Sequence, residues 1–267
     1  MSREILTKDN GDGMPRFFIK NEQIENDVVR IVGNDAFHIS RALRMAAGER
    51  ITACDEEGTE YDCELITFAD GYVEGRIRER CGSKTEPCFF AHIYQGLPKG
   101  DKLDLIIQKT VECGASALTT FESDFCIVKS KADAEPKKLE RRQRIALEAA
   151  KQCGRGMIPE IYPTVSFERM LDEASKADIV LFCYEGEGTL PIGKHIGGGV
   201  LREIAEREGR KPRVAIIVGS EGGFSEKEAS AALARGFKMC GLGKRILRTE
   251  TASMFALCCL VYENELL

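Results

Sequence analysis

Three glycine-containing segments in the second half of the sequence have the composition of ligand-binding loops. They cover residues 183–188, 218–225 and 241–251, and the last one adds arginine and threonine side chains. Glycine lets backbone atoms approach a ligand closely and adopt positive φ angles. A tight turn explains any one of these loops, but three of them at one predicted sheet indicate a shared ligand site.

The glycine loops do not fit the common nucleotide-binding motifs. Residues 219–223 lack the spacing G-x-G-x-x-G, and the sequence contains no G-x-x-x-x-G-K-[ST]. These absences disfavour a Rossmann dehydrogenase, an ordinary Rossmann-type methyltransferase and a P-loop NTPase.

The eleven cysteines and three histidines do not have the spacing of a metal site. No C-x-x-C pair occurs, and the adjacent Cys258 and Cys259 lie in an apolar helical pattern. The sequence also shows neither a secretion signal nor an apolar run of membrane length. We therefore expect no metal, no membrane association and a reducing, cytoplasmic location.

The net charge of −5 conceals a basic segment. Residues 1–80 hold 11 basic and 17 acidic side chains, whereas Lys129 to Arg155 holds nine basic and four acidic ones, a net of +5. Such an excess can follow the phosphates of a nucleic acid, although a solvated helix face has the same composition.

The elements that must position these residues fall into two predicted domains. Residues 1–13 are polar and are expected to be a flexible extension. Residues 14–82 consist of short apolar or alternating runs, which predict a small β-barrel or sandwich with one helical stretch at 35–45. The polar segment 82–87 marks the boundary. From residue 88 to 267 strands and helices alternate, which predicts an α/β domain with a mainly parallel sheet.

Two helices of this second domain follow the glycine loops directly. Ser225 and Glu228 form an S-x-x-E capping box that starts a helix through Ala234. The final helix, from Ala252, is apolar on nearly all sides, so we expect it to fill a core or to meet another subunit.

Two late motifs closely resemble the signature of the RsmE family, the bacterial small-subunit ribosomal RNA uracil-N3 methyltransferases. They are residues 216–225, I-I-V-G-S-E-G-G-F-S, and residues 242–252, L-G-K-R-I-L-R-T-E-T-A. Earlier segments resemble the family in the same order along the chain: P-R-F-F at 15–18, Q-G-L-P-K-G-D-K at 95–102 and E-A-A-K-Q at 148–152. Two positions depart from its pattern: Ser220 stands where the family has proline, and residues 153–157 differ from its usual Ser-Gly-Arg form.

The resemblance implies a small PUA-like β-barrel followed by a SPOUT methyltransferase domain, an α/β fold whose C-terminal segment forms a trefoil knot. It implies a homodimer that binds S-adenosyl-L-methionine in the knot and methylates N3 of one uridine in the 16S RNA of the small ribosomal subunit. The implied cofactor-binding residues are Tyr184, Gly219, Glu221, Gly222, Leu242, Gly243, Ile246, Leu247 and Thr251.

Uracil N3 carries a proton that must leave before the nitrogen can attack a methyl group. Arg245 or Arg248 can stabilise the developing uracil anion, and Glu250 can accept the proton. An acid in the first turn of a helix also favours the helix dipole, so the identity of the base stays open. The residues expected to bind RNA are Arg16, Arg41, Arg44, Lys99, Lys102, Arg141, Arg142, Gln152 and Arg155.

Two other functions are compatible with these motifs. One is a SPOUT enzyme that methylates a ribose 2′-oxygen or another base, in transfer RNA or 23S RNA; the R-I-L-R-T-E-T-A segment argues against it. The other is a knotted RNA-binding protein without catalysis, which the retention of all three loops with Arg245, Arg248 and Glu250 disfavours.

Overall fold

The computed structural model describes residues 14–129 and 135–267. The predicted extension, residues 1–13, and Lys131 of the basic segment lie outside the described residues. The described residues form two compact units: the chain up to Glu86 with Ala150–Ile158, and Pro87–Ala149 with Pro159–Leu267. The sequence prediction had placed residues 150–158 in the second domain, whereas here they belong with the first unit.

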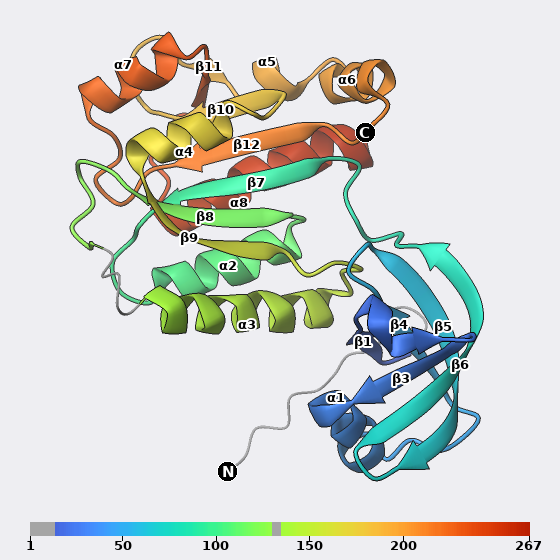
Figure 1. Ribbon diagram of the computed structural model, residues 1–267. Coiled ribbons are helices and arrows are strands. Elements are labelled where there is room, and N and C mark those ends of the chain that lie inside the picture. Colours follow the sequence, from blue (N-terminus) through green and yellow to red (C-terminus); the bar gives the residue numbers. More distant parts are fainter. Residues whose placement is uncertain (1–13, 130–134) are drawn as a thin grey trace. The chain divides into compact units, whose positions relative to one another are not determined.

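A six-stranded sheet in the order β1-β4-β5-β6-β3-β2 forms the first unit (Figure 1). Neighbouring strands are antiparallel except β1 and β4, which are parallel. Val29, Ile51 and Leu65 share one buried core with Phe17 of the edge strand, so the curved sheet encloses a single apolar interior. The strands are β1 (Arg16–Phe18), β2 (Ile24–Glu25), β3 (Val28–Val32), β4 (Arg50–Cys54), β5 (Thr59–Ala69) and β6 (Tyr72–Gly82).

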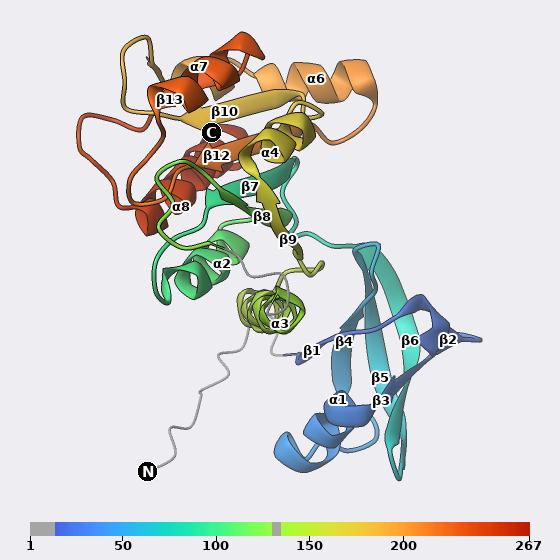
Figure 2. The ribbon, with the colours of Figure 1, turned by 60° about the vertical axis from the view of Figure 1, so that its left-hand side comes forward.

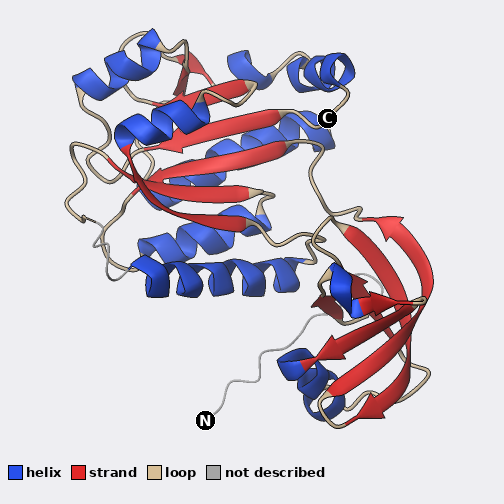
Figure 3. Cartoon of the chain, in the orientation of Figure 1, coloured by secondary structure: helices blue, strands red, loops and turns tan. Residues whose placement is uncertain are grey.

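The second unit contains a seven-stranded sheet in the order β11-β13-β10-β12-β7-β8-β9, and every pair in it is parallel. Figure 3 shows the contrast between the strand-rich first unit and the alternating second one. The strands are β7 (Phe90–Gly96), β8 (Ala117–Glu122), β9 (Glu160–Ser166), β10 (Ile179–Cys183), β11 (Leu190–Pro191), β12 (Arg213–Val218) and β13 (Lys238–Gly241).

Helices cover both faces of this sheet (Figure 2). On one face α2 and α8 pack against each other, with α8 lying on β7 and β12. On the other face Met170 of α4 and Ala232 of α7 share a buried core with Phe121, Phe182 and Ile217 of the strands. The helices are α2 (Lys102–Glu112), α3 (Glu135–Cys153), α4 (Phe167–Ala174), α5 (Gly193–Ile196), α6 (Val200–Glu208), α7 (Glu226–Ala234) and α8 (Thr249–Val261). None of the helices described is long and apolar enough to cross a membrane.

Most predicted elements of the sheets are confirmed, and the differences have local causes. The helical stretch expected at 35–45 is divided into α1 (Gly33–Phe37) and a π-helical turn, His38–Ala42. The final helix begins at Thr249 rather than Ala252, because Arg248 before it has an extended backbone and acts as the N-cap. Strand β9 is not among the predicted strands. It lies at the edge of the sheet and only one of its residues is buried, so its sequence lacks the continuous apolar run that predicts a buried strand.

Candidate functional site

Four loops leave the same edge of the second unit's sheet. Since β13, β10, β12 and β7 are adjacent and parallel, their carboxyl ends lie side by side, where open α/β sheets bind ligands. Residues 184–189 follow β10, 219–225 follow β12 and 242–248 follow β13. The structure therefore brings the three predicted glycine loops together, with a fourth loop, residues 97–101, after β7.

The loop after β12 is a tight turn fixed at both ends. The amide of Gly223 donates to the carbonyl of Ser220 at 2.9 Å, and Gly223 has a φ of +67°, which favours glycine. Helix α7 then starts with the predicted capping box: Ser225 Oγ accepts from the amide of Glu228, and the Glu228 carboxylate accepts from the amide of Ser225. These bonds hold the loop's backbone in one conformation.

A second glycine is required where the loops after β7 and β12 touch. A Cβ atom on Gly96 would lie 2.5 Å from the backbone nitrogen of Ser220 and 2.8 Å from the carbonyl carbon of Gly219. Both are backbone atoms and cannot move aside as a flexible side chain can. Gly96 therefore sets the close approach of the two loops.

A buried hydrogen-bond cluster, formed by Gln95, Gly219 and Thr249, ties three segments of the site together. Gln95 Nε2 donates to Thr249 Oγ1 at 2.8 Å and lies 3.2 Å from the carbonyl of Gly219. Thr249 Oγ1 in turn donates to the same carbonyl at 2.7 Å. Gln95 is fully buried and Thr249 is 6% exposed. Neither side chain was predicted as a site residue, because their pairing joins positions far apart in the sequence.

Lys102 links two carboxylates of the site. Its Nζ lies 2.8 Å from Glu221 Oε1 and 3.8 Å from Glu250 Oε2. The hydrogen bond to Glu221 raises the pKa of Lys102. Partial burial acts to raise the pKa of Glu221, but the hydrogen bonds from Lys102 and from the backbone outweigh it and lower that pKa. The Glu221 carboxylate also accepts from the amide of Lys99 at 3.1 Å, so it is bonded to the loop after β7 as well as to the first residue of α2.

The third loop presents most of its side chains outward. Arg245 and Arg248, the predicted anion-stabilising residues, are exposed, and Ile246 is 84% exposed. Glu250, the predicted base, has one buried carboxylate oxygen, Oε2, that makes no hydrogen bond within the residues described. The other predicted cofactor residues of the three loops also lie at this edge. Tyr184, Leu242, Leu247 and Thr251 are half-buried, Gly219 is buried, and Glu221, Gly222 and Gly243 are exposed.

The residues predicted to bind RNA divide by exposure. On the surface lie Arg41, Arg44, Lys99, Arg141 and Gln152, and Arg141 pairs with Asp104 at 2.7 Å. Arg16 is half-buried and pairs with Glu60 at 2.8 Å. Arg142 is 7% exposed and pairs with Glu135 at 3.0 Å. Lys102 is half-buried and pairs with Glu221 at 2.8 Å, so five of the nine predicted residues have exposed side chains.

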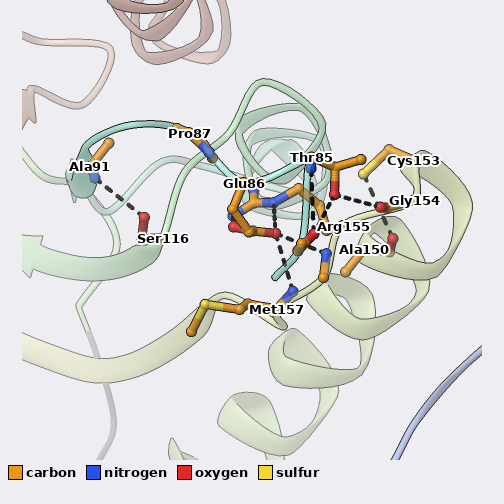
Figure 4. Close-up of polar contacts among 12 residues, drawn as sticks. Thr85, Glu86, Pro87, Ala91, Ser116, Ala150, Cys153, Gly154, Arg155 and Met157 are labelled. Atoms are coloured by element: carbon orange, nitrogen blue, oxygen red, sulfur yellow. Dashed lines mark hydrogen bonds and ion pairs between the residues drawn. The ribbon is translucent and has the colours of Figure 1, made fainter. Parts of the chain in front are cut away.

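Arg155 was also predicted to bind RNA, but its guanidinium lies inside the first unit. Its side chain is 4% exposed and makes a two-pronged ion pair with Glu86, with Nε to Oε1 at 2.8 Å and Nη2 to Oε2 at 2.6 Å (Figure 4). Glu86 Oε1 also accepts from the amides of Gly156 and Met157. This geometry gives Arg155 a role in holding residues 150–158 to the end of the first unit. The charge count that suggested RNA binding does not reveal such pairing.

The edge therefore gathers backbone amides, one shared ammonium, two carboxylates and two exposed guanidinium groups. Such a set can bind a polar cofactor and stabilise an anion. Among the residues described, no group of three or more His, Cys, Asp or Glu side chains is arranged to hold a metal ion. All eleven cysteines are free thiols.

Two family models match the chain. The one described as an RNA methyltransferase domain matches residues 84–261, and the one described as an RNA methyltransferase PUA domain matches residues 31–77. The PUA model falls within the first unit, and the methyltransferase model covers most of the second unit together with residues 84–86 and 150–158 of the first.

Curated relatives and solved structures agree with these matches. The ribosomal RNA small subunit methyltransferase E of Bacillus subtilis (strain 168) is 35% identical over 95% of this chain and 98% of its own length. A methyltransferase from Legionella pneumophila, solved with bound SAM, has a TM-score of 0.76 at 27% identity, covering 93% of this chain and 97% of that one. A ribosomal RNA small subunit methyltransferase E from Neisseria gonorrhoeae, bound to S-adenosyl methionine, has a TM-score of 0.75 at 28% identity, with coverage of 93% and 97%.

Proposed function

Because the chain belongs to the ribosomal RNA small subunit methyltransferase E family, we propose that it methylates N3 of one uridine in 16S ribosomal RNA. It is an S-adenosylmethionine-dependent RNA methyltransferase, with a methyltransferase domain and a PUA domain. The observation that carries the proposal is the convergence of the three glycine loops at one sheet edge, with Arg245, Arg248 and Glu250 on the last of them.

The residues at this edge fit S-adenosylmethionine. A Cβ atom on Gly96, Gly219 or Gly222 would meet neighbouring protein atoms at 3.0 Å or less, so these glycines let the loops of the site pack closely against one another. The cofactor would be held by Tyr184, Gly219, Glu221, Gly222, Leu242, Gly243, Ile246, Leu247 and Thr251. When bound, it supplies a methyl group on a positively charged sulfur. Fixed alignment of the two reacting atoms is a large part of what an enzyme contributes to such a transfer.

The chain's own residues handle charge and protons at the uridine. The Glu250 carboxylate accepts the N3 proton, which frees the nitrogen lone pair to bond to the methyl carbon; the electron pair of the broken carbon–sulfur bond stays on the sulfur, which becomes neutral. Arg245 and Arg248, which are exposed beside it, stabilise the negative charge on the uracil ring while the proton is absent. The buried Oε2 of Glu250 makes no hydrogen bond within the described residues and has the Lys102 ammonium 3.8 Å away as its ion-pair partner; a buried oxygen without a hydrogen bond supports a functional role for this side chain.

The other parts of the proposal concern architecture and location. A C-terminal trefoil knot of the SPOUT type is supported by β12 and β13 flanking β10 and by the return of α8 onto α2. A homodimer is supported by a stripe of exposed side chains one turn apart on the C-terminal helix: Phe255, Cys258 and Tyr262. The PUA domain, with Arg41 and Arg44 exposed, is proposed to bind RNA. A ribosomal RNA substrate and cysteines that are free thiols both support a cytoplasmic location.

One experiment tests the function. The protein is incubated with labelled S-adenosylmethionine and unmethylated small ribosomal subunits, and the product is mapped by mass spectrometry. Label at N3 of a single uridine is expected. Label on a ribose hydroxyl or on another base contradicts the uracil-N3 proposal, and cofactor binding without transfer indicates a non-catalytic RNA-binding protein.

A further inference from the structure

Phe125 is an exposed aromatic residue on a firmly anchored turn. Its side chain is 50% exposed and follows β8 at the carboxyl edge of the sheet. Next to it, the amide of Asp124 donates to Glu228 Oε1 at 2.9 Å, and Asp124 Oδ2 accepts from Ser225 Oγ at 2.6 Å. Within the turn, the amide of Cys126 donates to the carbonyl of Ser123 at 3.1 Å. The exposure of Phe125 is therefore fixed by the fold and does not result from a loose loop.

The turn is anchored to the capping box that also holds the cofactor loop. Glu228 accepts from the amide of Asp124 through Oε1 and from the amide of Ser225 through Oε2. Glu228 is itself 4% exposed. One buried carboxylate thus sets the position of the Phe125 turn relative to the loop after β12.

Phe125 lies directly against that loop. A Cβ atom on Gly222 would be 2.6 Å from Phe125 Cβ. The side chain of Phe125 is therefore in contact with the backbone of a predicted cofactor-binding residue. Phe125 therefore borders the loop after β12, one of the three glycine loops at this edge of the sheet.

The ring also differs from the other phenylalanines on this face of the sheet. Phe121, Phe167, Phe182 and Phe224 contact one another in a buried aromatic cluster. Within the described residues, no ring contact involves Phe125. Single exposed apolar side chains are common on protein surfaces, so the distinguishing features are the anchored turn and its place at the site.

We propose that Phe125 is the stacking partner of the target uracil. The inference rests on the proposed function. A uridine inside folded RNA must be turned out before its N3 can react, and proteins hold such bases by stacking them on aromatic side chains. The other side chains proposed to act on the uracil here, Arg245, Arg248 and Glu250, are charged. They can neutralise the ring's charge or accept its proton, and a flat apolar surface completes the recognition of a base.

Kinetics with unmethylated small ribosomal subunits test this role. Phe125→Leu is expected to lower kcat/KM for the subunits about tenfold, with the Kd for S-adenosylmethionine unchanged by calorimetry. Phe125→Tyr keeps a flat ring and should restore kcat/KM to within about twofold of the wild type. Phe90→Leu is the matched control, since Phe90 is 39% exposed at the other end of a neighbouring strand. Melting temperatures confirm that each variant is folded.

A second measurement uses the absence of tryptophan from the chain. Phe125→Trp supplies one fluorophore, whose emission should be quenched when a 16S RNA transcript is added; Phe90→Trp should respond much less. Equal responses of the two variants contradict stacking.

The possible failures are distinct. If the wild type does not methylate subunits, the proposed function fails. If the wild type methylates them and Phe125→Leu is equally active, only the stacking role fails. If Phe125→Leu weakens S-adenosylmethionine binding as much as it lowers kcat/KM, the ring supports the cofactor instead. If Phe125→Leu changes the molecular mass measured by analytical ultracentrifugation, the ring lies between two copies of the chain. Either of the last two results overturns the proposal.

Discussion

The Nζ atom of Lys102 lies 2.8 Å from the carboxylate of Glu221, so the first residue of α2 is joined to the loop after β12. Both side chains are about one-third exposed, at 32% and 30%. An ion pair of this exposure contributes little to global stability. Its effect is local: together with the close packing at Gly96, it holds the loops after β7 and β12 beside each other.

We therefore expect Lys102→Met to weaken S-adenosylmethionine binding by about two- to fivefold, measured by calorimetry, since an ion pair this exposed is weak. The effect should shrink in 1 M salt, which screens the pair. Lys109→Met is the control, because Lys109 forms an i,i+3 pair with Glu112 on the same helix. A loss of binding that is identical in both variants, or that is insensitive to salt, would show that the pair does not position the loop.

The Thr249 hydroxyl is predicted to be necessary for cofactor binding. Thr249→Val has nearly the same shape but leaves Gln95 Nε2 without its closest acceptor and removes one donor to the Gly219 carbonyl. Gln95 Nε2 keeps its longer contacts with the carbonyls of Gly96 and Gly219, at 3.1 and 3.2 Å, so the change removes two hydrogen bonds that contribute about 0.5–1.5 kcal/mol each. We expect a fall of that size in the free energy of unfolding and at least a tenfold loss of cofactor affinity. Thr249→Ser keeps the hydroxyl and should bind like the wild type; equal affinities of the Val and Ser variants would refute the prediction.

Variants of the buried ion pair between Glu86 and Arg155 distinguish a structural role of Arg155 from a role in RNA binding. Breaking a buried pair by removing one partner costs about 3–5 kcal/mol, since the other charge is left uncompensated. Arg155→Met and Glu86→Gln should therefore both lower the free energy of unfolding strongly in urea titrations. Arg202→Met removes an exposed i,i+4 pair with Glu206 and should change it by less than about 0.5 kcal/mol. If Glu86→Gln is harmless and Arg155→Met weakens only RNA binding, Arg155 contacts RNA after all.

His92 should make the second unit sensitive to acid. Its ring stacks between Tyr94 and Tyr162, and burial lowers its pKa from 6.5 to about 4. Between these two values the unfolded chain binds a proton that the folded chain does not, so stability falls as pH drops from 6.5 towards 4. His92→Gln removes this titration, and its free energy of unfolding should vary less over that range. Parallel urea titrations at pH 7 and 4.5 measure the difference; the same loss in both proteins would exclude His92 as the cause.

The sequence predicts the parts of this site that lie in one segment and misses those that join distant ones. The glycine loops and the Ser225–Glu228 capping box depend on neighbouring residues, and the structure contains both. The hydrogen bond from Gln95 to Thr249 spans 154 positions, and Phe125 reaches Gly222 across about a hundred. Gln95 begins the segment 95–102 that resembles the family, but that segment does not reveal its partner Thr249, and Phe125 lies in no motif; the order of strands in the sheet is what brings them to this edge.

A count of charges along the sequence likewise does not show which charges are paired in the fold. The segment from Lys129 to Arg155 is basic in sequence, but Arg142 and Arg155 are buried against Glu135 and Glu86. Counting describes how many charges a segment holds and gives no information on their partners. The exposed arginines outside that segment, Arg41 and Arg44, are therefore better candidates for RNA contact than its buried ones.

The assignment of residues 150–158 to the first unit has a consequence for folding during synthesis on the ribosome. A domain made of one continuous segment can fold as soon as it is synthesised, and domains generally do so in order from the N-terminus. Here the charge of Glu86 cannot be paired until Arg155, 69 residues later in the chain, has been synthesised. By then β7, β8 and α2 have been made, while β12, which must insert beside β7, has not. The first unit therefore cannot be completed until part of the second has already been synthesised.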